Sequence, residues 1–218
     1  MFMFFRPVFF ASLLMVLVHP AFAQSDAARY EDCMRSVMEQ PLAAYETALA
    51  WEADSGGAPA RHCVASALIE LGDMERAAER LKDLGSAPDI RTDQLRAEIF
   101  GQSAEVFLQL AQYANALAAI DAALALVPDD FQLRIDRARA LVELEEIEAA
   151  VQELDTVLAS QPDDLLALRL RATGLIQLQQ LALAELDVAQ ALSLAPSAVD
   201  VLLLRGALRE AQRLAAKP

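Results

Sequence analysis

Few residues in this 218-residue sequence have the type and spacing that chemistry requires. Cys33 and Cys63 are the only two cysteines. In a chain that enters an oxidising compartment, such a pair is expected to form a disulfide bond, and the alternative is two separate buried thiols. A metal site is disfavoured, because Cys33, His62 and Cys63 supply only three ligands and adjacent residues of a helix do not point at one centre.

The remaining residues offer no catalytic machinery. His19 lies in a segment that we expect to be removed, so His62 would be the only histidine of the mature chain. No nucleophile, base and orienting group can be assembled around it. Gly56-Gly57 is typical of a turn, and no phosphate-binding loop occurs. The sequence therefore predicts no catalytic residue, no metal and no cofactor, with a hydrolase or redox enzyme as the remote alternative.

Three arginines recur at one constant interval along the chain: Arg137, Arg171 and Arg205. Asp121 and Asp155 precede the first two by sixteen residues, whereas Ala189 precedes the third, with Asp187 nearby. We interpret Asp121–Arg137 and Asp155–Arg171 as structural ion pairs that join successive helices. A ladder of charges that binds a ligand is the alternative.

The N-terminus has the three parts of a secretory signal peptide. Residues 1–6 carry one positive charge, residues 8–18 are almost wholly apolar, and Ala21-Phe22-Ala23 precedes Gln24. This apolar run is too short for a membrane-spanning helix, which needs about 20 residues. The sequence predicts cleavage after residue 23 and a bacterial periplasmic location. Secretion or an uncleaved inner-membrane anchor is the alternative.

A repeat of about 34 residues organises the rest of the chain. Three prolines mark it, and alanines stand twelve and twenty-four residues before each proline: Pro128, Pro162 and Pro196; Ala116, Ala150 and Ala184; Ala104, Ala138 and Ala172. Apolar residues between these positions are spaced by three and four, which predicts pairs of amphipathic helices. One hairpin cannot bury its apolar stripe alone, so stacked copies forming a solenoid are expected.

These residues resemble the tetratricopeptide repeat over residues 97–198. The resemblance implies an all-α, right-handed α–α superhelix. The early aromatic position departs from the pattern, since Phe100 is followed by Arg134 and Leu168. We expect degenerate helical repeats over 24–96 with the disulfide, three repeats over 97–198, and a C-terminal capping helix over 199–218 that begins at the N-cap Ser197. About eleven helices and no strand are predicted.

The resemblance also implies a partner-binding concave face formed by the first helix of each pair. By position, its residues would be Gln102, Glu105, Gln109, Asp136, Arg139, Glu143, Arg169, Thr173 and Gln177. The Lys/Asn clamp of chaperone-binding members is absent at the matching positions. The net charge of −14 argues against nucleic acid and against anionic membranes as partners. The predicted function is a periplasmic scaffold for a protein or peptide partner, with a non-catalytic accessory subunit of a cell-envelope enzyme complex as the alternative.

Overall fold

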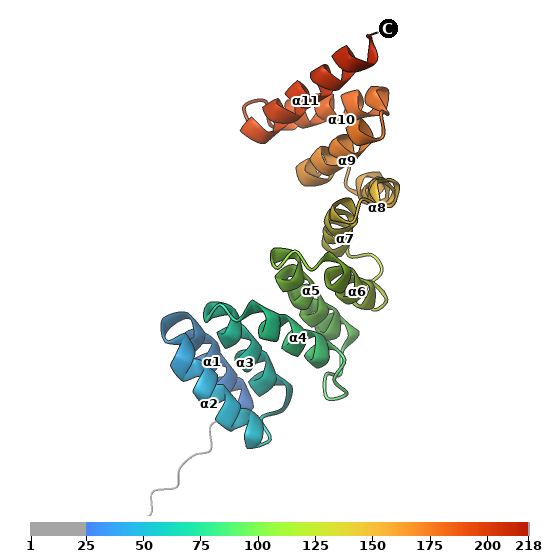
Figure 1. The fold of residues 1–218 in the computed structure, drawn as a ribbon. Coiled ribbons are helices and arrows are strands. Elements are labelled where there is room, and N and C mark those ends of the chain that lie inside the picture. The colour runs from blue at the N-terminus through green and yellow to red at the C-terminus, as the bar shows by residue number, and fades with distance from the viewer. Residues whose placement is uncertain (1–24, 218) are drawn as a thin grey trace, which may run out of the picture.

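The computed structural model describes residues 25–217, which fold into eleven α-helices with no strand in that range (Figure 1). The predicted signal peptide lies outside the described residues. The helices are α1 (Asp26–Glu39), α2 (Pro41–Ala53), α3 (Gly57–Glu70), α4 (Met74–Gly85), α5 (Asp93–Gln109), α6 (Tyr113–Leu124), α7 (Phe131–Glu143), α8 (Ile147–Ser160), α9 (Leu165–Gln177), α10 (Leu181–Leu194) and α11 (Val199–Ala215).

The helices form antiparallel hairpins that follow one another in chain order, as in an α-solenoid (Figure 1). Extensive contacts join only helices that are neighbours or next-but-one neighbours along the described chain. The first helices of the hairpins are α1, α3, α5, α7 and α9, and the second helices are α2, α4, α6, α8 and α10. Among the first helices, α1 contacts α3, α5 contacts α7 and α7 contacts α9, so these neighbours lie on one surface of the solenoid.

The repeated alanines lie between the helices, where a larger side chain would keep them apart. Ala104, Ala138 and Ala172 of the first helices are at most 1% exposed, and so are the alanines of the second helices, Ala116, Ala150 and Ala184. The apolar residues around them form a series of clusters along the solenoid. The repeated pattern thus specifies helix contacts that recur from one hairpin to the next.

Aspartate side chains begin two of the repeated helices. The side chain of Asp130 accepts a hydrogen bond from the Leu133 amide at the start of α7, and Asp164 does the same for Ala167 in α9, at 3.0 and 2.7 Å. Such caps satisfy amides that have no partner inside the helix. At the corresponding position before α11 stands Ala198, which offers no side-chain cap. The prediction that Ser197 caps this helix is therefore wrong.

The turn inside four of the five hairpins, from α3–α4 to α9–α10, places one residue in the left-handed region. Gly72 has φ 78°, and the equivalent residues Ala111, Glu145 and Gln179 have φ between 56° and 63°. The amide that follows each of them bonds to a carbonyl five residues back, as in the bond from Gln112 to Phe107 at 2.9 Å. This is the Schellman pattern that ends a helix and satisfies its last carbonyls.

The N-terminal hairpins depart from the strict repeat. The segment between α4 and α5 covers residues 86–92 and buries Ala87 and Ile90, and α5 has 17 residues. Gly85 ends α4 against Phe100, where an added Cβ would lie 2.8 Å from the ring. A glycine is needed at this point because the aromatic ring occupies the space of a side chain.

Candidate protein-binding groove

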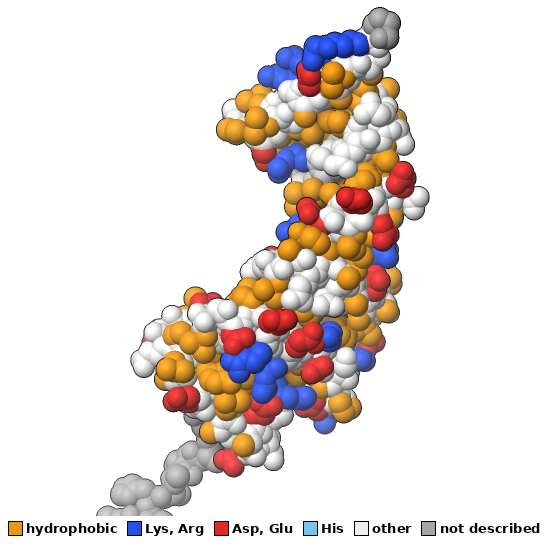
Figure 2. Space-filling model, viewed as in Figure 1, with side chains coloured by type: hydrophobic (Ala, Val, Ile, Leu, Met, Phe, Trp, Pro, Cys, Tyr) orange, Lys and Arg blue, Asp and Glu red, His pale blue; other side chains and the backbone are white. Residues whose placement is uncertain are grey.

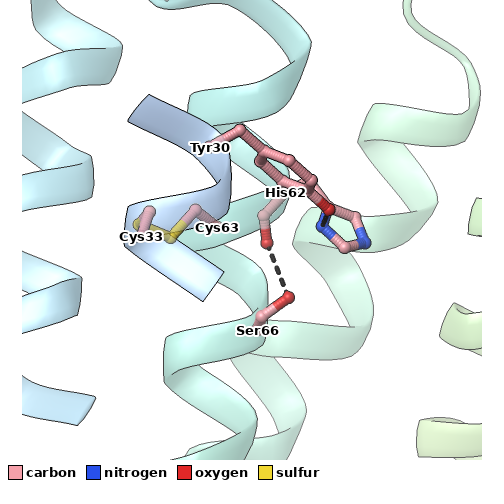
Figure 3. Close-up of a disulfide and its surroundings, with 5 residues drawn as sticks. All are labelled: Tyr30, Cys33, His62, Cys63 and Ser66. Carbon is pink, nitrogen blue, oxygen red and sulfur yellow. Dashed lines mark hydrogen bonds between the residues drawn. A yellow bond between two sulfur atoms is a disulfide. The ribbon is translucent and has the colours of Figure 1, made fainter. Parts of the chain in front are cut away.

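A disulfide and a short series of polar contacts join helices α1, α3 and α5. Cys33 of α1 and Cys63 of α3 are bonded, with their Cα atoms 6.3 Å apart, and both are buried (Figure 3). Beside them, the Tyr30 hydroxyl lies 2.9 Å from Nδ1 of His62, and Nε2 of His62 lies 2.8 Å from Oε1 of Gln102 on α5. Burial raises the pKa of Tyr30. The arrangement gives His62 a structural role between α1 and α5.

A pocket of 280 Å³ opens next to this histidine on the surface of the first helices. Tyr30, His62 and Gln102 form its polar part, while Ile90 and Leu95 belong to its apolar part. Leu95 is 46% exposed. Gln102 is thus the one predicted partner-binding residue that lines this pocket.

Two further pockets follow on the same surface. They lie where the solenoid is concave, between α5 and α11 (Figure 2). The central pocket measures 260 Å³ and brings together Leu108, Tyr113, Arg139, Val142, Glu143 and Leu170. The C-terminal pocket measures 350 Å³ and brings together Arg169, Leu170, Thr173, Ile176, Gln177, Asp200, Leu203, Leu204 and Ala207. Leu170 lines both pockets, so they form one groove from α5 to α11.

The groove has an apolar floor and a polar rim. Leu108, Val142 and Leu170 are partly buried at its centre, and Leu203 of α11 is 69% exposed at its C-terminal end. Solvent-accessible leucines arranged in a concave surface are typical of sites that bind an apolar side chain of a partner. We call this surface, from Leu108 to Leu203, the central groove.

Intramolecular pairs occupy the charged groups on the rim. Arg139 lies 2.8 Å from Asp136 and 3.5 Å from Glu105, and Arg169 of α9 lies 2.7 Å from Asp200 of α11. Burial raises the pKa of Asp136 despite its bond to Arg139. Arg139 and Arg169 therefore connect neighbouring helices of this surface. Their charges are already paired within the chain and are not free to bind an acidic ligand.

The structure separates the predicted partner-binding residues into groups. Arg139 and Glu143 line the central pocket; Arg169, Thr173 and Gln177 line the C-terminal one. Glu105 and Asp136 reach this surface through Arg139. Gln109 lines none of the three pockets and donates a hydrogen bond to Glu105 at 3.2 Å.

Sequence reasoning missed the apolar floor. Leu108, Val142 and Ile176 occupy the same position in three successive repeats. The repeat alone could have identified them as one row on the first helices. Apolar residues of an amphipathic helix are typically buried in the core, and the stacking of the hairpins leaves these three partly accessible.

The repeated arginines lie at the junctions between first and second helices. Arg137 bonds Asp121 of the preceding second helix at 2.8 Å and Glu153 of its own hairpin at 2.7 Å. Arg171 bonds Asp155 of the preceding second helix at 2.7 Å. It also makes two bonds to Asp187 of its own hairpin, at 2.6 and 2.9 Å. These bonds to Asp187 are the main reason that the pKa of Arg171 is raised.

Asp187 thus pairs with Arg171, sixteen residues before it, and not with Arg205. Each of the two arginines contacts the second helices on both sides, which fixes how one hairpin stacks on the next. These pairs lie at the helix junctions, away from the residues that line the central groove.

The described part of the chain contains neither a metal-binding cluster nor a membrane span. No group of three or more histidine, cysteine, aspartate or glutamate side chains within residues 25–217 could hold a metal ion. No helix in the same range combines the length and apolarity needed to cross a membrane.

Residues 105–173 match the family model of the tetratricopeptide repeat. No curated protein matches the chain. Among solved structures, MamA (41-end) from Desulfovibrio magneticus RS-1 is 17% identical, with 81% of this chain and 98% of that one covered and a TM-score of 0.66. YrrB, described as a tetratricopeptide-repeat protein with an unusual peptide-binding site, is 17% identical, with 82% and 86% covered and a TM-score of 0.65. The first such domain of Spaghetti (RPAP3), bound to the HSP90 peptide SRMEEVD, is 20% identical, with 59% and 99% covered and a TM-score of 0.53.

Proposed function

We propose that this chain, whose residues 105–173 match the tetratricopeptide-repeat family model, is a periplasmic interaction scaffold that holds a peptide segment or helix of another protein in the central groove. The observation that carries the proposal is the row of accessible apolar side chains between paired charges. Two of the similar structures are described with a peptide or a peptide-binding site, which supports a protein ligand for this chain.

The chemistry of the groove indicates which ligand it would hold. Leu108, Val142 and Leu170 present apolar surface, while the rim arginines are already neutralised by Asp136, Glu105 and Asp200. A ligand with apolar anchors spaced along one face therefore suits the groove better than a strongly charged one. Burial of the anchors would supply most of the affinity.

Replacing Leu170 with aspartate is expected to reduce partner capture at least about tenfold, because the side chain lines both pockets and a carboxylate there would have to be desolvated by an apolar ligand. The measurement is affinity capture from a periplasmic extract, quantified by mass spectrometry. Leu183→Asp is the matched control, since Leu183 is 51% exposed on α10 and lines none of these pockets.

Circular dichroism should show equal helicity in both variants. Undiminished capture by Leu170→Asp, with the fold intact, would remove the central groove as the binding site. Equal losses in Leu170→Asp and Leu183→Asp would show that the added charge acts nonspecifically.

The periplasmic location is supported by the Cys33–Cys63 bond, because disulfides persist mainly in oxidising compartments. We expect the exported protein to begin at Gln24. Intact-mass measurement of the protein from the periplasmic fraction of a bacterial host should give the mass of residues 24–218. A mass that retains residues 1–23 would favour the membrane-anchored alternative.

A further inference from the structure

The C-terminal helix α11 has the sequence and position of the first helix of a hairpin. Its residues Leu202, Arg205, Gly206 and Arg209 stand one repeat after Leu168, Arg171, Ala172 and Leu175 of α9. In the α9 hairpin these positions face the second helix α10, and their three apolar members are at most 3% exposed. We call the four residues of α11 the C-terminal seat.

No helix covers the C-terminal seat among residues 25–217. Gly206 is exposed, and nothing lies within 4 Å of the point where its Cβ would be, whereas Ala172 at the same position in α9 is fully buried. Val199, at the start of α11, is 71% exposed. The surface that a second helix would cover in the repeat is therefore open.

The charge of the C-terminal seat indicates what could cover it. Arg171 makes two bonds to a carboxylate of its second helix, and Arg137 makes one to Glu153 of its own. Arg205 has the same position, but neither it nor Arg209 has a hydrogen bond or ion pair with any described residue. Basic side chains gather at this end of an otherwise acidic chain (Figure 2).

We propose that the C-terminal seat docks an amphipathic helix of another protein that carries a carboxylate among small apolar residues. In the repeat, the corresponding helices present Glu153 or Asp187 between alanines, valines and leucines. A docked helix of this kind would place its acid against Arg205 and a small residue against Gly206. It would extend the solenoid by completing the last hairpin.

A second copy of the chain is a poorer occupant. Two C-terminal seats facing each other would bring the arginines of one α11 against those of the other, and like charges in an interface are unfavourable. The seat is also separate from the central groove, whose α11 residues are Asp200, Leu203, Leu204 and Ala207. The two sites can therefore be tested independently.

The probe is a labelled synthetic peptide of residues 147–160, the α8 sequence, in which Glu153 holds the position that faces Arg137. Titrated with the full chain at low salt, it should show saturable binding by fluorescence anisotropy. Arg205→Glu should weaken the Kd at least about tenfold. The same peptide with Glu153→Arg should bind Arg205→Glu at least about tenfold better than it binds the unmodified chain.

Arg213→Glu is the matched control, because Arg213 pairs with Glu210 on its own helix. It should leave the Kd of the peptide nearly unchanged. Arg205→Glu is expected to keep its helicity in circular dichroism, since Arg205 makes no polar contact that the substitution could break.

Three results would overturn the proposal. The first is the absence of saturable binding of the unmodified peptide. The second is an equal loss of peptide affinity in Arg205→Glu and Arg213→Glu, which would indicate nonspecific electrostatic attraction. The third is concentration-dependent self-association in sedimentation velocity that Arg205→Glu abolishes, which would assign the seat to a second copy. A variant of the central groove, Leu170→Asp, should leave peptide binding at the seat intact.

Discussion

Replacing Arg171 with leucine is expected to lower the free energy of unfolding by about 3–5 kcal/mol, the usual cost of removing one partner of a buried ion pair. Arg171 makes two bonds to Asp187, whose side chain is only 4% exposed. Without the guanidinium, this carboxylate stays buried with no counter-charge. The measurement is urea unfolding followed by circular dichroism.

The double variant Arg171→Leu/Asp187→Leu should recover most of that loss, because no uncompensated charge then remains in the junction. Arg205→Leu is the matched control at the same position of the next repeat, and it should change stability by less than about 0.5 kcal/mol. Asp155→Leu alone should cost at most about 1 kcal/mol, since Asp155 is 57% exposed. Equal destabilisation in the single and the double variant would contradict the pairing.

Removing the disulfide with Cys33→Ala/Cys63→Ala is expected to cost about 3–4 kcal/mol, because the bond closes a segment with a sequence separation of 30 and restricts the unfolded chain. It joins α1 to α3, so the loss should be largest in the N-terminal hairpins. Hydrogen exchange resolved along the chain would locate it, and urea unfolding would measure its size.

Reduction of the unmodified protein serves as the control, because it opens the bond without removing the sulfur atoms from the core. Reduction and the double variant should lower stability by similar amounts. Two unmodified thiols in the exported protein, detected by mass spectrometry without reductant, would show that the bond does not form in the cell.

The sequence predicted those features that are repeated along the chain. Pro128, Pro162 and Pro196 with their alanines indicated the hairpins, and the structure places those alanines in the helix contacts. The solved structures confirm the all-α solenoid, and the family match confirms the tetratricopeptide repeat over residues 105–173. A repeated sequence pattern predicts structure well because each copy makes the same contacts with its neighbours.

Features that depend on how the hairpins curve could not be read in the same way. Leu170 is an apolar residue of an amphipathic helix, and its sequence does not say that it remains accessible between two first helices. The pairing of Arg171 with Asp187 was missed for a different reason. The spacing of Asp155 predicts a partner sixteen residues before Arg171, whereas the more buried partner, Asp187, stands sixteen residues after it.

The restriction of contacts to neighbouring helices also determines how the molecule can deform. A small rotation at each junction adds to the next, so small changes at several junctions can together widen or narrow the solenoid. No single junction has to break for this to happen, because each one turns by only a little. The width of the hollow is therefore set by all the junctions together, and Arg137 and Arg171 each bridge one of these junctions.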